Sequence, residues 1–361
     1  MRFDFTADQR LFQESIRSLL AKECPADCLR PLSQTETGRS PERWRKLAEV
    51  GLLALLAPES HGGLGLDEVD LVLPLEETGR VALPEPVVET AAVAVPLLRE
   101  ANAEALRDEW LARVSTGDAV LAVGDEANPC VGDAHVADLL LLPIGDEIHA
   151  LRRESVALEP QPCNDPCRRL FRVRWTPGRS TRIAGGDEGR RLLDAARDRG
   201  ALATAAQLLG LGQQLVDLAA RYATQRQQFG RPIGAFQAVK HMLANVQVRL
   251  EFARPVVYRA AFSVARSAGT RAVDVSHAKV AASDAAVQAA KAALQVHGAI
   301  GYTWEADLHF WMKRAWALEA VWGGRAWHRA RVGAAILDGA GRAASFGYSA
   351  RASGVMATDG K

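Results

Sequence analysis

The feature that most constrains the fold is a series of long amphipathic segments in the second half of the chain. Apolar residues recur there at helical spacing in three rows: Leu208, Leu211, Leu215, Leu218 and Tyr222; Phe236, Val239, Leu243, Val246, Leu250, Ala253 and Val257; Val273, Val280, Val287 and Leu294. Apolar stripes of this period need neighbouring helices to cover them. With a last helix after Trp304, they predict an antiparallel four-helix bundle over residues 189–338.

The first half of the chain has two different textures. Residues 1–113 are predicted to form a helical domain, with Thr6 and Ser40 as N-caps and Pro41 in a first helical turn. Residues 114–188 contain short apolar or alternating runs such as "DAVLAVG", "ADLLLLPIG", "EIHALRRE" and "RLFRVRW". Gly, Pro, Asp and Asn separate these runs, which is typical of strands in a small β domain. We therefore expect an α+β chain that is mostly α, ending in an Ala/Gly/Ser-rich flexible tail over 339–361.

Composition excludes several classes of function. Of 361 residues, 48% are hydrophobic and 24% are charged, which is ordinary for a globular protein. The net charge of +1 favours neither nucleic acid nor an anionic membrane as a partner. The N-terminus has acids inside its first apolar stretch and no run of about 18 apolar residues follows, so no signal peptide or membrane span is expected.

The cysteines favour a reducing compartment. Five of them, an odd number, in a chain of this size predict a cytoplasmic protein rather than a disulfide scaffold. Cys24 and Cys28 lie four residues apart, as do Cys163 and Cys167, and such spacing can place two thiols on one helical face. Pro162 and Pro166 argue against a helix at the second pair. Without further Cys or His groups nearby, no metal site is expected.

Three motifs carry a resemblance to a known family. They are "GLLALLAPESHGGLGLDEVDLVLPLEETGR" (51–80), "YATQRQQFGRPIGAFQAVKHMLANVQVRLEFAR" (222–254) and "QVHGAIGYTWEADLHFWMKRA" (295–315). Their order and spacing resemble the acyl-CoA dehydrogenase family over roughly residues 1–335. The resemblance implies a flavoprotein that desaturates an acyl-CoA thioester. A carboxylate base removes the α proton, and the β hydrogen leaves as hydride to FAD.

In that family each FAD lies across a subunit interface, so one chain contributes to the flavin of its neighbour. By motif match, this chain's contribution is Arg226, Phe229, Gln237, Gln295, Gly298 and Ala299. Arginine offers a fork of donors to a phosphate, and glycine admits close backbone approach. The family usually has glycine at the position of Ala299. Alternatively, Arg226 is a solvated cation at a helix end and Gln237 is an ordinary bundle cap.

The residues expected around the chain's own flavin ring depart from the family pattern. The segment "AVGDEANPCVGDAHVADLLLLP" (122–143) contains neither of the two β-domain motifs that line the ring, and the following strand arrives early. The common base position holds Trp322, in "VWGG", and the alternative base position holds Asn245, in "HMLANVQ". Neither side chain accepts a proton from carbon at neutral pH.

Other carboxylates near these positions are Glu251, Asp307 and Glu319. Glu251 is expected to form a helix-surface ion pair with a neighbouring arginine. Glu319 precedes Trp322 by three residues, which on one continuous helix would place both on the same face. It is the first candidate for a displaced base; the alternative is a structural carboxylate paired with Lys313, Arg314 or Arg325.

The resemblance therefore favours a non-catalytic subunit of an α2β2 complex with a second acyl-CoA dehydrogenase-like chain. That partner would supply the base and most acyl-CoA contacts, as in two-gene enzymes that actinobacteria use on sterol side chains in cholesterol catabolism. An electron-transfer flavoprotein or a similar carrier would accept the electrons. Two alternatives stay open: a self-sufficient homotetramer with Glu319 as its base, and a flavin-free structural or regulatory protein.

Overall fold

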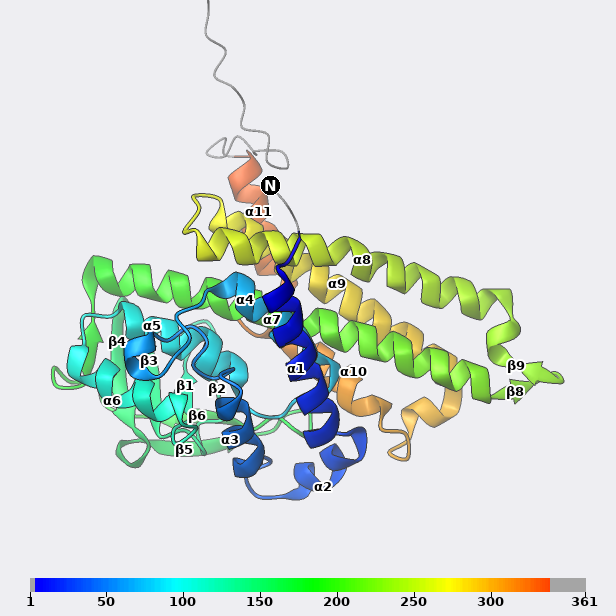
Figure 1. The fold of residues 1–361 in the computed structure, drawn as a ribbon, viewed down its shortest axis with the longest axis horizontal. Coiled ribbons are helices and arrows are strands. Elements are labelled where there is room, and N and C mark those ends of the chain that lie inside the picture. The colour runs from blue at the N-terminus through cyan, green and yellow to red at the C-terminus, as the bar shows by residue number, and fades with distance from the viewer. Residues whose placement is uncertain (1–3, 338–361) are drawn as a thin grey trace, which may run out of the picture.

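Helices dominate the computed structural model, which describes residues 4–337 (Figure 1). Helices come first, a small β region follows, and long helices complete the chain, so the predicted α+β architecture is confirmed. The tail predicted over 339–361 lies outside the described residues. Among residues 4–337, no helix is long and apolar enough to cross a bilayer.

The N-terminal region consists of six α-helices and a π-helical segment over Val88–Ala94. The helices are α1 (Ala7–Glu23), α2 (Leu29–Gln34), α3 (Pro41–Glu49), α4 (Glu68–Arg80), α5 (Val95–Glu100) and α6 (Glu104–Ser115). Two predicted caps are confirmed. Thr6 forms a capping box with Gln9 at the start of α1, and the Ser40 side chain accepts a hydrogen bond from the Arg43 amide at the start of α3.

Two small sheets form the β region between Leu121 and Ala184. One has the order β1-β3-β4-β7 and the other the order β2-β6-β5. The strands are β1 (Leu121–Val123), β2 (Val131–Gly132), β3 (Leu139–Ile144), β4 (Glu147–Arg152), β5 (Ala157–Gln161), β6 (Leu170–Arg174) and β7 (Arg182–Ala184). Along β3 the side chains alternate, because successive residues of a strand point to opposite faces. Leu139 and Leu141 join the main core, whereas Leu140 and Leu142 belong to a separate core of the β region.

The C-terminal region is built on three long helices, α7 (Gly186–Gln225), α8 (Gln237–Ala265) and α9 (Arg271–His297). Two shorter helices, α10 (Leu308–Ala320) and α11 (Arg325–Leu337), complete it. Helix α9 packs against both α7 and α8, and most of its buried residues are alanines, which let the helices approach closely. The predicted bundle is therefore present. The β region lies between the end of α6 at Ser115 and the beginning of α7 at Gly186.

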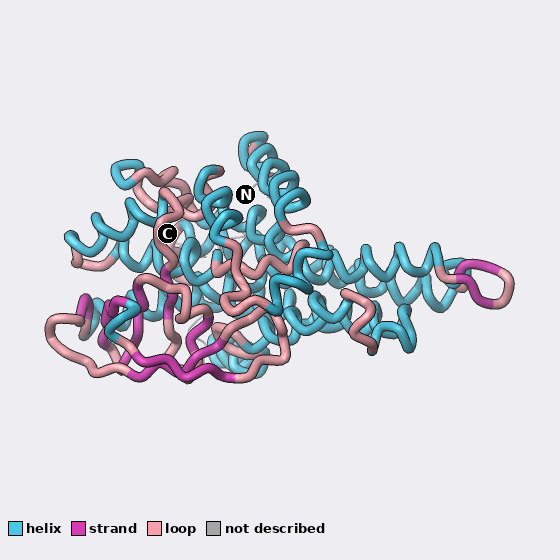
Figure 2. Tube along the Cα trace, turned by 90° about the horizontal axis from the view of Figure 1, so that it is seen from below, coloured by secondary structure: helices cyan, strands magenta, loops and turns pink. Residues whose placement is uncertain are grey.

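A short hairpin extends the bundle beyond its helix ends. Strands β8 (Gln227–Gln228) and β9 (Arg231–Pro232) join α7 to α8. Figure 2 shows this hairpin as the outermost point at one end of the molecule, far from the strands of the β region. The two ends of the bundle therefore carry different features: the hairpin at one, the β region near the other.

Candidate functional site

The hairpin presents an aromatic side chain to the outside of the molecule. Phe229 and Gly230 occupy the turn with φ angles of 52° and 75°, the positive values that a tight two-residue hairpin turn requires. Phe229 is 91% exposed, and its ring lies edge to face with that of Phe236, with ring centroids 6.0 Å apart. A bulky residue with positive φ is strained. A strained and exposed aromatic at a projecting turn is typical of a contact surface.

Arg226 and Gln237 flank this hairpin. Arg226 caps the end of α7 through its backbone, and its carbonyl accepts the Ile233 amide that closes the loop. Its side chain is exposed, and within residues 4–337 no carboxylate pairs with it. The Gln237 amide lies 3.0 Å from the His241 ring, at the exposed first turn of α8. Both side chains are thus available to a group outside this chain.

The end of α9 lies at the same end of the bundle, because α7 and α9 both run antiparallel to α8. The His297 ring stacks on Tyr222 of α7 at a centroid distance of 4.4 Å. Gly298 follows with φ 64° and ψ −141°, a conformation that only glycine adopts readily. A Cβ atom built there would meet nothing within 4 Å. Gln295 and Ala299 are exposed beside it, so the six residues singled out from sequence share one open end of the molecule.

Trp322 lies elsewhere, between the bundle and the β region. It is 5% exposed and lines a cavity of about 200 Å³ together with Val123–Glu126 of the β region and Arg197 of α7. Asp125 and Arg197 form an ion pair of 3.1 Å at this cavity. Ligand sites of drug-like size measure about 300–1,000 Å³. The indole therefore stands in a place where little space remains for a flavin ring.

A glycine on α7, Gly200, leaves space for the indole ring of Trp322. A Cβ at Gly200 would lie 2.3 Å from Cδ2 of Trp322, closer than any real contact. The Trp322 carbonyl accepts a hydrogen bond of 3.0 Å from Nε2 of buried His328. Burial lowers the pKa of His328 to about 4, so the ring is neutral, and its Nδ1 accepts from Ser276 at 3.1 Å. Packing and hydrogen bonds thus fix the loop that holds Trp322.

Comparison with known proteins identifies the family. The profile of the acyl-CoA dehydrogenase C-terminal domain matches residues 187–337, and the profile of the N-terminal domain matches residues 6–118. The chain belongs to the acyl-CoA dehydrogenase family. The segment between the two matches is the β region.

Individual acyl-CoA dehydrogenases are similar over most of their length. The acyl-CoA dehydrogenase IpdE2 of Mycolicibacterium smegmatis is 34% identical over 310 residues, covering 85% of this chain and 92% of the relative. IpdE2 of Mycobacterium tuberculosis is 31% identical over 309 residues, covering 85% and 91%.

Solved acyl-CoA dehydrogenase structures share the fold. A chain of the ChsE4-ChsE5 complex from Mycobacterium tuberculosis has a TM-score of 0.83 at 24% identity, covering 94% of this chain and 99% of that chain. A chain of the Tcur3481-Tcur3483 steroid ACAD G363A variant has a TM-score of 0.82 at 24% identity, covering 92% and 98%.

The predicted placement of Glu319 beside Trp322 is wrong. Helix α10 ends at Ala320, so Trp322 lies in the following loop and the two residues do not share a helical face. Glu319 instead accepts a 2.5 Å hydrogen bond from Nε of Arg325, whose other nitrogen bonds Asp284 at 2.7 Å. The alternative interpretation, a structural carboxylate paired with Arg325, agrees with this geometry.

The second acyl-CoA dehydrogenase base position is also without a carboxylate. Asn245 is exposed on α8. Six residues further along α8, Glu251 forms the predicted ion pair with Arg254 and also accepts a hydrogen bond from Gln247. Partial burial raises the pKa of Glu251, but these hydrogen bonds outweigh it and hold the pKa below its usual value. Asp307 pairs with Arg30 of α2, so the nearby carboxylates are engaged in ion pairs.

Family membership implies FAD, and the two regions of this chain fit that cofactor differently. The bundle end offers a guanidinium with no carboxylate partner among residues 4–337, an exposed aromatic ring and an open glycine, which suit a phosphate and a ring system. The cavity beside Trp322 is lined by Asp125, Glu126 and a buried indole whose Nε1 has no hydrogen-bond partner within the described chain. These residues do not fit an isoalloxazine ring.

Sequence reasoning missed a buried lysine next to the Trp322 loop. Lys279 of α9 is completely buried, and its Nζ donates to the carbonyls of Leu318 and Val321 at 2.7 and 2.6 Å. Burial lowers its pKa to about 7. Lys279 thereby caps the C-terminus of α10, where unpaired carbonyls favour a cation. Helical spacing alone gives no sign of this contact, because it joins residues about forty positions apart.

Proposed function

We propose that this chain is the non-catalytic subunit of a FAD-dependent acyl-CoA dehydrogenase made of two different chains. It contributes Arg226, Phe229, Gln237, Gln295, Gly298 and Ala299 to a flavin held mainly by its partner. The partner supplies the base and most of the contacts with acyl-CoA. Two such pairs form an α2β2 assembly, in which electrons pass to an electron-transfer flavoprotein or a similar carrier.

One observation carries this proposal. The side chains predicted to contact a neighbour's flavin are exposed, whereas the predicted position of this chain's own base is occupied by a buried tryptophan. Phe229 is 91% exposed, whereas Trp322 is 5% exposed in the position of the family's base. A self-sufficient enzyme needs both regions, and a protein without flavin needs neither. The pairing of Glu319 with Arg325 also weakens the self-sufficient alternative, because an ion-paired carboxylate is a poor base.

The bound flavin would accept the β hydrogen as hydride, and this chain's residues would hold the cofactor in place. Arg226 would bind the pyrophosphate through its guanidinium, and Phe229 would pack on the cofactor. The backbone at Gly298 would approach it closely, because no side chain is in the way. Proton abstraction belongs to the partner, since Trp322 and Asn245 cannot perform it.

The proposed substrate is the CoA ester of a steroid side chain. The Tcur3481-Tcur3483 steroid ACAD and the ChsE4-ChsE5 complex, both with this fold, support a two-chain assembly and, in the first case, a steroid substrate. A subunit without its own acyl-CoA site leaves room for a polycyclic acyl group in its neighbour's site.

Co-expression tests the assembly. This chain is purified alone and together with an adjacent acyl-CoA dehydrogenase-like gene product, and flavin absorbance is measured per chain. We expect yellow protein only after co-expression, with one FAD for each pair of chains. A yellow and active oligomer of this chain alone would refute the proposal.

Substitution tests the contribution to the partner's flavin. Arg226→Ala is expected to lower the flavin content of the purified complex, because a buried phosphate loses its guanidinium. The matched control is Arg179→Ala, another exposed arginine, in the loop before β7. Equal flavin retention in both variants would remove Arg226 from the cofactor site.

A further inference from the structure

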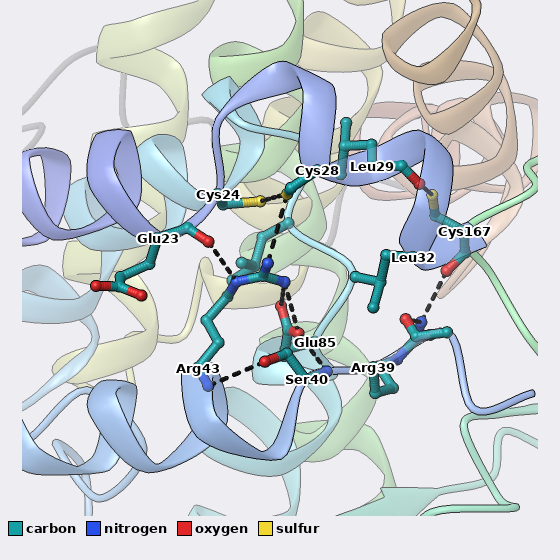
Figure 3. A network of polar contacts seen from close by, with 12 residues as sticks. Glu23, Cys24, Cys28, Leu29, Leu32, Arg39, Ser40, Arg43, Glu85 and Cys167 are labelled. Carbon is teal, nitrogen blue, oxygen red and sulfur yellow. Dashed lines mark hydrogen bonds and ion pairs between the residues drawn. The ribbon is translucent and has the colours of Figure 1, made fainter. Parts of the chain in front are cut away.

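Two cysteines that the proposed function does not use lie against each other in the N-terminal region. Cys24 ends α1, and Cys28 closes the 3-10 turn over Ala26–Cys28. They do not share one helix, but their sulfur atoms are 3.8 Å apart and point toward one another (Figure 3). A disulfide between residues four apart is sterically possible only when the two side chains face each other. This first requirement is met.

A locked arginine contacts one of the two sulfurs. Nη2 of Arg43 lies 3.4 Å from Sγ of Cys28. The guanidinium is held by Glu85, through bonds of 2.8 and 3.1 Å from Nη1, and by the Glu23 carbonyl at 2.9 Å from Nε (Figure 3). Arg43 and Glu85 are both buried. The positive charge therefore cannot move away from Cys28, although Glu85 offsets part of it.

The two thiols are consequently unequal. The hydrogen bond with Cys24, together with the Arg43 guanidinium, lowers the pKa of Cys28 to about 7, against the opposing effects of burial, Glu85 and Asp27. The same sulfur–sulfur hydrogen bond and burial raise the pKa of Cys24. Cys28 is half-buried, whereas Cys24 is 2% exposed and lines a surface cavity of about 310 Å³. A partly exposed thiol with a lowered pKa next to a buried thiol with a raised pKa is the arrangement of an attacking and a resolving cysteine.

The second cysteine pair has the same spacing without this arrangement. No hydrogen bond joins Cys163 to Cys167 in the described part of the chain, and Cys167 donates instead to the Leu29 carbonyl at 3.8 Å. Burial raises the pKa of Cys167 to about 11. Cys163 and Cys167 therefore serve as an internal control for the effect of spacing alone.

We propose that Cys24 and Cys28 form a redox-active pair that a hydroperoxide converts to a disulfide. The Cys28 thiolate attacks the peroxide, so that an S–O bond forms, the O–O bond breaks and Cys28 becomes a sulfenic acid. The leaving alkoxide or hydroxide takes up the proton that the Cys28 thiol released. The Cys24 thiol then attacks that sulfur, so that an S–S bond forms, the S–O bond breaks and water leaves. With hydrogen peroxide, two thiols lose two electrons and two protons in total, and the oxidant is reduced to two water molecules.

Peptide mass spectrometry tests this proposal on the intact chain. Trypsin releases Cys24 and Cys28 together in residues 23–39, and Cys163 and Cys167 together in residues 154–168. After graded hydrogen peroxide treatment, we expect the 23–39 peptide to lose two hydrogen atoms first and to regain them with dithiothreitol. Loss of hydrogens from the 154–168 peptide at an equal or lower dose would overturn the proposal.

Two serine variants separate the roles of the thiols. With Cys24→Ser, dimedone should trap a sulfenic acid on Cys28, because no resolving thiol remains. With Cys28→Ser, Cys24 should stay unlabelled. Labelling of Cys24 rather than Cys28 would refute the assignment, and the wild-type peptide masses decide the proposal even if a variant misfolds.

Discussion

Replacing Gly200 by alanine tests whether the Trp322 ring fills the space beside α7. The new methyl carbon would lie 2.3 Å from Cδ2 and 2.5 Å from Cε2 of the indole. Because the ring is rigid and 5% exposed, it has to shift, and overpacking of this kind costs about 1–3 kcal/mol. Alanine is better than glycine inside a helix by about 0.5–1 kcal/mol. The overpacking cost exceeds this gain over most of its range, so the variant should be destabilised.

The same change should have the opposite effect once the ring is gone. Trp322→Ala alone costs about 3–5 kcal/mol, as expected for loss of a buried tryptophan. In that background, Gly200→Ala meets no indole and should stabilise the chain through its helix propensity. The two substitutions should therefore couple by about 1–3 kcal/mol, the overpacking cost that the indole ring imposes, which lies within the range of about 0.5–3 kcal/mol for residues in contact.

Urea unfolding followed by circular dichroism measures this cycle. Gly333→Ala is the matched control, since this α11 glycine has nothing within 4 Å of an added methyl carbon and should gain only helix propensity. The reasoning fails if Gly200→Ala stabilises the wild-type chain as much as Gly333→Ala does. Additive effects of Gly200→Ala and Trp322→Ala would equally show that the ring does not occupy this space.

Three further substitutions have expected outcomes. Glu319→Gln should leave the turnover of the assembled enzyme unchanged, because this carboxylate is paired with Arg325. A loss of turnover of about 100-fold or more, typical for a general base, would make Glu319 a catalytic candidate again. Phe229→Ala should lower flavin retention in the complex but not the melting temperature of the chain alone. The control is Phe252→Ala, since Phe252 is 75% exposed on α8. A similar flavin content in both variants would contradict the cofactor contact. Burial raises the pKa of Glu76 to about 7, so the unfolded chain loses this proton near pH 4.3 and the folded chain only near pH 7. Stability should therefore fall between about pH 4.3 and 7, and Glu76→Gln should reduce that fall in pH-dependent urea unfolding; an unchanged pH profile would show that Glu76 does not titrate in this way.

Local patterns were sufficient for the features that depend on neighbours in sequence. The caps at Thr6 and Ser40 could be predicted, because each requires only a side chain and the backbone amides that follow. The rows of apolar residues predicted the bundle for the same reason. The predicted face shared by Glu319 and Trp322 was wrong because α10 stops at Ala320. Lys279, from a different helix, binds the carbonyls of Leu318 and Val321 at that stop.

The cavity beside Trp322 could not be predicted from the sequence either, because its walls come from segments far apart in the chain. The sequence shows that Trp322 and Asn245 are not carboxylates, but what surrounds Trp322 depends on contacts between distant segments. Gly200 admits the indole, and Arg197 pairs with Asp125 across the boundary between α7 and the β region. A sequence motif shows which residue stands at a position, whereas only the folded structure shows which side chains surround it.

The strained turn of the β8–β9 hairpin supports the proposed contact with a partner. Two-residue turns with positive φ at both positions favour Asn-Gly or Asp-Gly, because these residues tolerate that conformation. Phe229 holds the first position at φ 52° with 91% of its surface exposed, so within this chain it gains little packing in return for a strain of order 1 kcal/mol. Asparagine at this position would favour the folded monomer. This strain without a return inside the chain supports the proposed role of Phe229, whose ring would pack on the cofactor of a neighbouring subunit.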